Sequence, residues 1–197
     1  MADYTLQFSN QTDDVYTLAL FAELDDAAQV AVAWLTQRTP PSGAALLQWT
    51  VRWNVGIAHC ERGKFYGAQA LPAEPGQGWV VICENGVPRL VSDSNHPPPN
   101  QIAIANRSGL LVNAGVGMSG GPMAYVANLL SGSSARFYVP MRIAVALFTD
   151  IEPGEVVTPL KMVAGPSLVE FPAGITDGMV TASLDGDRVE LELTFDI

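Results

Sequence analysis

The chain is poor in basic residues, in cysteine and in histidine. Ten Lys and Arg stand against twenty Asp and Glu, so the 197 residues carry a formal charge of −10. Phosphate groups are bound by clustered Lys and Arg, and the ten here are scattered, so we expect neither nucleic acid nor an anionic membrane as a partner. The two cysteines and two histidines lack the paired spacing of a zinc site. We expect no cofactor, and reduced, buried thiols at Cys60 and Cys83.

The sequence also lacks a recognisable targeting or membrane segment. Its first residues, Met1-Ala2-Asp3-Tyr4-Thr5, include neither the basic stretch nor the apolar run of a secretory signal. Apolar runs are broken by Gly and Pro before they reach the roughly 18 residues that a membrane span needs. We therefore expect a cytoplasmic protein without a membrane span, in which the Asn-x-Ser/Thr triplets at Asn10 and Asn106 carry no glycan.

Helix-forming segments are scarce, and strand patterns take their place. Only residues 25–38 are rich in helix formers, and even there Val30, Val32 and Trp34 alternate as in a strand. Period-two alternation is clearest in residues 44–53, where one central strand would place Leu47, Trp49, Val51 and Trp53 on one face. Further strands are expected at residues 4–8, 15–20, 79–83, 87–91, 179–184 and 189–195.

Two turn pairs predict β-hairpins. Asn85-Gly86 and Asp185-Gly186 each separate two apolar runs, and such pairs tolerate the backbone of a tight hairpin turn. The strand after Asp185-Gly186 should be half exposed, with Val189 to Phe195 alternating inward and outward. Three consecutive prolines make residues 92–100 a surface loop, either a stiff connection or a polyproline recognition segment.

These patterns predict an all-β fold. With 48% hydrophobic and 15% charged residues the chain is not disordered, and its length suffices for a substantial core. We expect one β-sandwich domain over residues 1–197, with two antiparallel layers, about a dozen short strands and at most one short helix. No internal repeat is visible in the sequence.

Two short motifs resemble those of trypsin-like serine proteases. In residues 56–60, His59 occupies the position of the catalytic histidine in the protease motif. In residues 117–122, Ser119 occupies the position of the nucleophile in the glycine-rich loop. The sixty or so residues between them are too few to build the two barrels of that fold, and Asp93, the one aspartate between them, lies beside the prolines. A serine hydrolase that uses Ser119 and His59 is therefore a remote alternative, which a fluorophosphonate probe would detect.

Other candidate groups have an ordinary structural explanation. The acidic pairs Asp13-Asp14 and Asp25-Asp26 lack the alternating pattern of a calcium loop, so solvated loop charge is favoured over Ca²⁺ binding. Small residues around Ser119 predict a bulge or tight bend, with its hydroxyl on a local backbone group. The tryptophans, favoured as core residues over a stacking platform for a ligand, are Trp34, Trp49, Trp53 and Trp79.

An ordered series of short segments resembles the RhiA-like family of bacterial proteins, named for a rhizosphere-expressed protein under quorum-sensing control. The resemblance runs from residue 4 to about residue 160 and implies a small cytoplasmic protein with no assigned active site, so no site residue is carried over. The matching segments are residues 4–10, 30–35 with Pro40, 48–55, 61–63, the Asn85-Gly86 turn, 116–120, 137–140 and 152–156.

Three functions follow, in order of preference. The first is a non-enzymatic protein that acts by self-association or by binding a protein partner in a density- or stress-regulated bacterial programme. The second is a lectin-like or amphiphile-binding module, with aromatic and acidic loop residues as its site. The serine hydrolase comes last. A wide apolar face would favour assembly, whereas a concave pocket lined by tryptophans would favour a small ligand.

Overall fold

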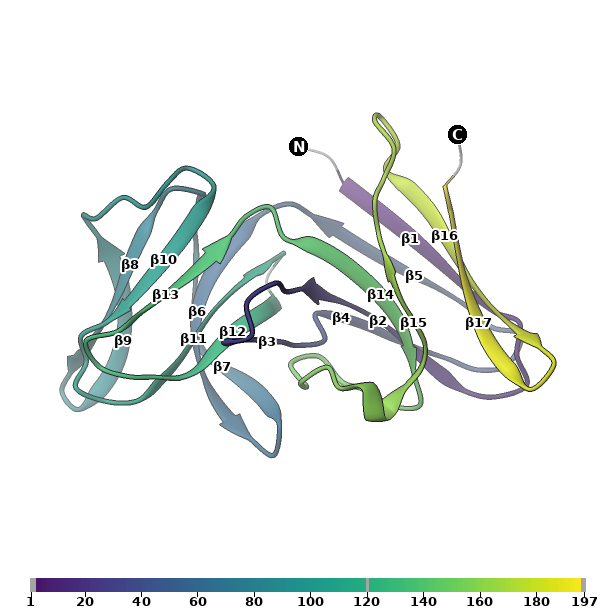
Figure 1. Ribbon diagram of the computed structural model, residues 1–197, viewed down its shortest axis with the longest axis horizontal. Coiled ribbons are helices and arrows are strands. Elements are labelled where there is room, and N and C mark those ends of the chain that lie inside the picture. The colour runs from purple at the N-terminus through teal and green to yellow at the C-terminus, as the bar shows by residue number, and fades with distance from the viewer. Residues whose placement is uncertain (1–2, 120, 196–197) are drawn as a thin grey trace.

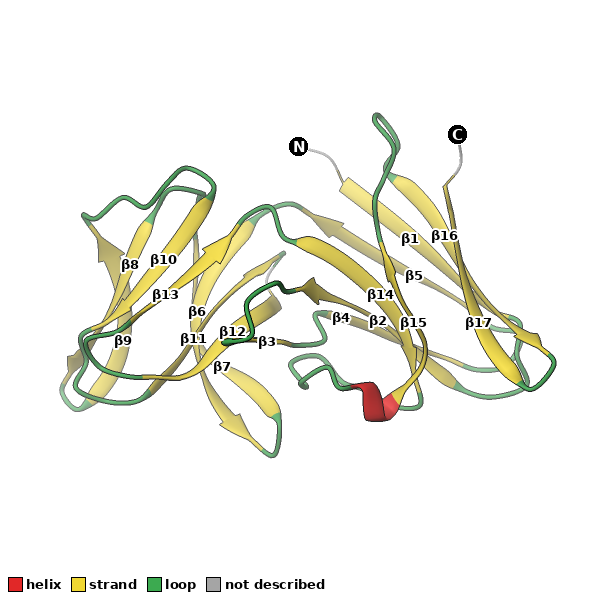
Figure 2. Ribbon diagram, in the orientation of Figure 1, coloured by secondary structure: helices red, strands yellow, loops and turns green. Residues whose placement is uncertain are grey.

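The computed structural model describes residues 3–119 and 121–195, and within them nearly every regular element is a strand (Figures 1 and 2). Seventeen strands form four sheets, and the one helical element of this part of the chain is a 3-10 turn, η1 (Pro159–Lys161). The all-β prediction is confirmed, with more strands than expected. The described residues contain no helix of the length and apolar character needed to cross a bilayer.

The strands fall along the whole chain. The first nine are β1 (Asp3–Asn10), β2 (Tyr16–Glu23), β3 (Gln29–Ala31), β4 (Leu35–Thr39), β5 (Ala44–Thr50), β6 (Trp53–Glu61), β7 (Lys64–Pro72), β8 (Gly78–Glu84) and β9 (Val87–Asp93). The others are β10 (Gln101–Asn106), β11 (Val112–Met118), β12 (Gly121–Leu129), β13 (Ser134–Tyr138), β14 (Arg142–Phe148), β15 (Met162–Leu168), β16 (Asp177–Asp185) and β17 (Arg188–Phe195).

The four sheets pack as two sandwiches that lie side by side (Figure 1). In sandwich I, sheet β17-β16-β1-β5 packs on sheet β15-β14-β2-β4, and contacts join β15 to β17 and β4 to β5. In sandwich II, sheet β13-β10-β8-β9 packs on sheet β3-β12-β11-β6-β7. The sequence predicts two layers, but seventeen strands exceed what one two-layer sandwich of ordinary size holds.

The two sandwiches are related by an internal duplication in which strands are exchanged. The strands β1, β2, β4, β5, β6, β7, β8 and β9 correspond in order to β10 through β17, and each sheet has a counterpart with the same strand order, except that β3 adds a fifth strand to one sheet of sandwich II. Sandwich I takes its first strands from the first half of the chain and its last strands from the second half. The exchange also explains two parallel pairs, β1 with β16 and β10 with β8, in sheets expected to be antiparallel.

A buried asparagine marks the same position in both halves. The side chain of Asn10 donates to the carbonyls of Asp14 and Thr39 at 2.8 and 3.1 Å, and its oxygen accepts from the Thr12 hydroxyl at 2.7 Å. Both Asn10 and Asn106 are 0% exposed. Asn10 and Asn106 are the asparagines of the two Asn-x-Ser/Thr triplets, and their side-chain amides hold together the ends of neighbouring loops.

Asn106 repeats this arrangement in sandwich II. Its side-chain amide donates to the carbonyls of Leu110 and Leu129 at 2.7 and 2.8 Å. Its side-chain oxygen accepts from the Ser108 hydroxyl at 2.7 Å and from the Ser108 backbone N–H at 3.0 Å. The hydroxyl residue two positions after each asparagine is therefore part of the motif, because it satisfies the buried amide oxygen.

Alternating burial along the strands builds the core, as the sequence predicts. In β1 Leu6 and Phe8 point inward, and in the corresponding strand β10 Ile102 and Ile104 do. All four tryptophans are buried. Both predicted hairpins are present, as β8–β9 around Asn85-Gly86 and β16–β17 around Asp185-Gly186.

Residues 25–38 contain β3 and most of β4, in agreement with the strand-like alternation of Val30, Val32 and Trp34. Two local predictions are wrong. Residues 44–53 do not make one strand: β5 ends at Thr50, and Trp53 begins β6 in the other sandwich, which leaves Val51 exposed. Cys60 and Cys83 are free but exposed, since both lie toward the ends of strands, beyond the core.

Tyr125 supplies a prediction on pH dependence. Its ring stacks on Phe65 with centroids 4.4 Å apart, and burial raises the pKa of its phenol to about 12. The unfolded chain ionises this group near pH 10, so above that pH the unfolded state has released a proton that the native state keeps. We expect stability to be unaffected by this group below about pH 10 and to fall between about pH 10 and 12. Urea unfolding at a series of alkaline pH values, with Tyr125→Phe as control, measures this slope.

Candidate functional site

A cleft opens where the chain crosses between the two sandwiches. Apart from the short strand β3, which lies in sandwich II between β2 and β4 of sandwich I, the chain passes from sandwich I to sandwich II through residues 51–52, after β5, and returns through residues 139–141, before β14. Both crossings line the cleft, whose volume is about 300 Å³. This lies at the lower end of the range for small-molecule sites, which favour such junctions. Lining residues from the two crossings and the adjoining strands are Trp49, Val51, Trp53, Pro140, Met141 and Ile143.

Aromatic rings form one wall of the cleft. Tyr4 on β1 stacks on Trp49 with centroids 5.7 Å apart and an interplanar angle of 17°. Phe171, in the loop between β15 and β16, packs against both rings at 4.9 and 5.9 Å. Trp34 supports Trp49 edge-on from behind and donates its indole N–H to the carbonyl of Met118 at 2.8 Å. The wall is therefore held in a fixed geometry by packing and a buried hydrogen bond.

The rest of the cleft combines adaptable and charged groups. Met118 and Met141 contribute thioether side chains, which adjust readily to the shape of a ligand. Arg142 forms ion pairs with Glu23 at 3.1 Å and with Asp25 at 2.7 Å. Glu170 lies at the rim, and its carboxylate has no hydrogen-bond or ion-pair partner among the described residues.

Three hollows adjoin the cleft and share residues with it. The first, of about 620 Å³, shares Pro140, Met141 and Arg142, and its other wall is the acidic loop of Asp25 and Asp26. The second, of about 390 Å³, shares Tyr4 and Trp49 and extends to Asp3 and Ser119. The third, of about 540 Å³, shares Val51 and Trp53. The crossing of the two sandwiches is thus a chain of connected depressions with aromatic and acidic borders.

Ser119 and His59 do not come together. In the antiparallel pair β6–β11, Ala58 faces Asn113 and Trp53 faces Met118, so the two residues lie at opposite ends of the pair, roughly 20 Å apart. The Ser119 hydroxyl instead donates to the Thr50 carbonyl and accepts from the Thr50 N–H at 3.0 Å. The expected backbone partner is correct in kind but lies on β5, distant in sequence. Gly120, in the same motif, lies outside the described residues.

The glycine-rich segment has the structural role that its sequence indicates. A register shift between Val116 and Gly117 makes a bulge in the pairing of β11 with β12. A Cβ on Gly117 would lie 1.8 Å from the carbonyl oxygen of Gly121. Ser119 has a φ of 48°, which turns the chain into β12. The motif that resembles a protease loop is therefore a tight strand connection.

Three of the four residues in the acidic pairs make contacts in or beside their loops. Asp26 accepts from the backbone N–H of Ala28 at 2.9 Å, and Asp25 pairs with Arg142. The backbone carbonyl of Asp14 accepts from Asn10. Among residues 3–119 and 121–195, no group of three His, Cys, Asp or Glu side chains is arranged to hold a metal ion.

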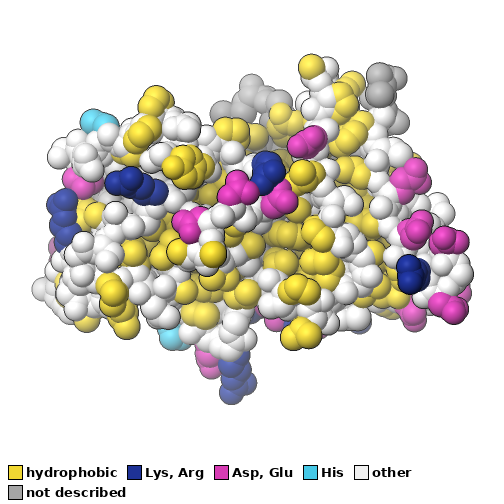
Figure 3. All heavy atoms as spheres, in the orientation of Figure 1, with side chains coloured by type: hydrophobic (Ala, Val, Ile, Leu, Met, Phe, Trp, Pro, Cys, Tyr) yellow, Lys and Arg dark blue, Asp and Glu magenta, His cyan; other side chains and the backbone are white. Residues whose placement is uncertain are grey.

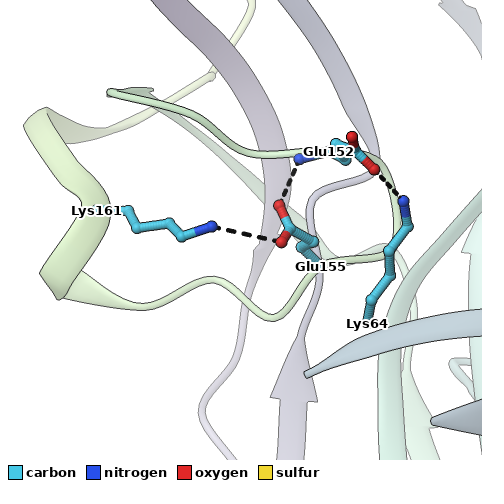
Figure 4. A network of polar contacts seen from close by, with 4 residues as sticks. All are labelled: Lys64, Glu152, Glu155 and Lys161. Carbon is cyan, nitrogen blue, oxygen red and sulfur yellow. Dashed lines mark hydrogen bonds and ion pairs between the residues drawn. The ribbon is translucent and has the colours of Figure 1, made fainter. Parts of the chain in front are cut away.

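A polar cluster of Lys64, Glu152, Glu155 and Lys161 joins β7 of sandwich II to the β14–β15 loop of sandwich I, and none of these residues lines the cleft (Figure 4). Lys64 pairs with Glu152, and Lys161 donates to Glu155 at 3.4 Å, while the Glu152 N–H donates to the Glu155 carboxylate at 2.7 Å. The hydrogen bond to Glu152 raises the pKa of the Lys64 ammonium and lowers that of the carboxyl. Exposed ion pairs contribute little stability, so we interpret this cluster as a positional link between the β14–β15 loop and β7.

Sequence patterns locate only part of the cleft. Trp49 and Trp53 are among the residues considered for a ligand platform, but Phe171, Met118 and Met141 are not. Phe171 lies outside any predicted strand, and Met118 belongs to the protease-like motif, which drew attention to Ser119 instead. What these three residues share is their position near residues 51–52 and 139–141, and this position can be recognised only once the exchange of strands between the sandwiches is known.

The fold and cleft define a class of all-β protein with two strand-exchanged sandwiches and an aromatic cleft between them. The chain belongs to the RhiA family, whose sequence model matches residues 1–191. No curated protein and no solved structure matches the chain. Family membership is therefore shown by sequence, over nearly the full length.

Proposed function

We propose that this protein is a non-catalytic, cytoplasmic binding protein whose central cleft takes a small apolar molecule. The observation that supports this proposal most strongly is the cleft itself. It is concave, is bordered by Tyr4, Trp49 and Phe171, and lies at the junction of the two sandwiches. Burial of aromatic and aliphatic surface would supply the affinity. Membership of the RhiA family supports a place in a density- or stress-regulated bacterial programme.

Binding of a neutral apolar fluorophore tests this proposal. We expect N-phenylnaphthylamine to bind with saturable fluorescence enhancement at one site per chain. Val51 borders the cleft and is 40% exposed, so Val51→Arg should leave the fold intact. The substitution should lower the affinity for the probe by roughly tenfold or more, because it places a charge in an apolar site. The control is Leu46→Arg, at 50% exposure on the outer face of β5, which should bind like the parent protein. Equal loss in both variants, or no saturable binding, contradicts the proposal.

Self-association is a second candidate, supported by the edge strand β7. Within its sheet this strand pairs only with β6, and its start at Lys64 and Phe65 also bonds to residues 154–155. Residues 65–71 contain neither a charged side chain nor a proline, whereas exposed edges are usually protected by charge or proline. Tyr66, Gly67, Ala68 and Ala70 are exposed along it. Such an edge can add a strand from a second copy.

The mass in solution tests this second candidate. If β7 mediates assembly, light scattering should give a mass above the 20.9 kDa of one chain, and Ala68→Lys should restore the single-chain mass. Ala44→Lys, at an exposed position of β5, is the matched control and should not change the mass. A strict monomer at all concentrations counts against assembly through this strand.

A further inference from the structure

We propose that the cleft selects a cationic amphiphile, a small molecule with an apolar aromatic body and an amine head. The inference rests on the proposed binding function and names the chemical class of its ligand. The aromatic wall of Tyr4, Trp49 and Phe171 receives the body. The acidic residues at the rim and in the adjoining hollows receive the head.

Carboxylates outnumber basic groups around the cleft. Six of them line the cleft and the three hollows that share its residues, against two basic side chains, Arg142 and Arg52. Arg52 faces the same hollow as Glu74, beyond Trp53. The six carboxylates belong to Asp3, Glu23, Asp25, Asp26, Glu74 and Glu170.

Arg142, the basic residue that lines the cleft itself, is already engaged. Its guanidinium is held by Glu23 and Asp25, so it does not offer a free cation to an anionic head group. On the face drawn in Figure 3, acidic side chains gather around a basic one near the upper middle of the molecule. Glu170, by contrast, borders the aromatic wall without a described partner for its carboxylate. It is the group best placed to meet an amine.

Aromatic rings and net charge act in the same direction. A cation near the faces of Tyr4 and Trp49 is attracted by their ring quadrupoles, which an anion is not. The whole chain carries a formal charge of −10, which raises the local concentration of cations and lowers that of anions. The cleft therefore discriminates by charge as well as by shape.

A matched set of three probes tests the inference. Naphthylmethylamine, naphthalenemethanol and naphthoic acid share one aromatic body and differ in charge at neutral pH. Calorimetric titration of the full chain should give the amine an affinity at least roughly tenfold higher than the acid, with the alcohol between them. Added salt should narrow the difference, because the groups at the rim are screened.

Two substitutions that each remove one negative charge test whether the preference for the amine arises at Glu170. Glu170→Gln should reduce the preference for the amine by severalfold, whereas Glu190→Gln, on the outward face of β17, should not change it. Equal binding of all three probes would overturn the charge selectivity and leave the proposed binding function standing. Absence of binding by all three, together with no binding of the neutral fluorophore, would overturn both. A preference for the amine that persists in Glu170→Gln but disappears in Glu190→Gln would also overturn the assignment.

Discussion

Asn106→Ala is expected to lower the free energy of unfolding by about 3 kcal/mol or more, one of the largest effects of any polar substitution in this chain. The side chain is fully buried and donates to two carbonyls while accepting from Ser108 twice, so its removal leaves several buried polar groups without partners. Because Asn10 holds the corresponding loop of sandwich I, Asn10→Ala should cost a similar amount. Urea unfolding measures both.

Two further variants separate hydrogen bonding from packing. Asn106→Asp keeps the shape but replaces the donating amide with an acceptor, so it should destabilise at least as strongly as alanine. Asn100→Ala, at an exposed loop position, should change the free energy of unfolding by less than about 0.5 kcal/mol. A loss below about 1 kcal/mol for Asn106→Ala would show that this asparagine does not organise the loop.

Gly117→Ala is expected to destabilise the protein by more than about 3 kcal/mol or to prevent folding. A Cβ at this position would lie 1.8 Å from the Gly121 carbonyl oxygen and 2.7 Å from the Cα of Pro122, and both obstacles are backbone. The bulge between β11 and β12 would have to open. Met118, which follows Gly117 and lines the cleft, would then lose its fixed position.

Gly67→Ala is the matched control for this prediction. Gly67 lies on β7, its φ is ordinary, and nothing lies within 4 Å of an added Cβ. Its replacement should be neutral or stabilising by roughly 0.5 kcal/mol, because alanine reduces the freedom of the unfolded chain. Thermal unfolding of the two variants side by side gives the comparison. Similar stability of both would mean that the β11–β12 connection relaxes freely.

The alternating pattern of single strands could be read from the sequence, but the arrangement of strands between sandwiches could not. Leu6 and Phe8 alternate with polar neighbours, and burial of one face follows from the period of a strand. The pairing of β1 with β16 joins residues from opposite ends of the chain, and no local pattern encodes such a contact. The error at residues 44–53 has the same origin, since the crossing at Val51 keeps the alternating period while the chain changes sandwich.

The duplication was hidden because its two copies share geometry rather than sequence. Leu6 and Phe8 correspond to Ile102 and Ile104, which preserve burial but not identity. The turn pairs Asn85-Gly86 and Asp185-Gly186 recur at corresponding hairpins, but such pairs occur in hairpins of any fold. The Asn-x-Ser/Thr triplets also recur, and as a glycosylation signal they point away from their structural role. A buried asparagine with a hydroxyl residue two positions on is the feature that could have aligned the halves.

The central claim, that a small ligand occupies the cleft between the sandwiches, is tested most directly by methionine-methyl NMR. Met118 and Met141 line the cleft, whereas Met123 lies in the core and Met162 and Met179 lie elsewhere. On addition of naphthylmethylamine we predict saturable shifts for the methyl groups of Met118 and Met141 and unchanged positions for the other three. Shifts centred on Met179 or Met162, or no shift at any methionine, would contradict the account.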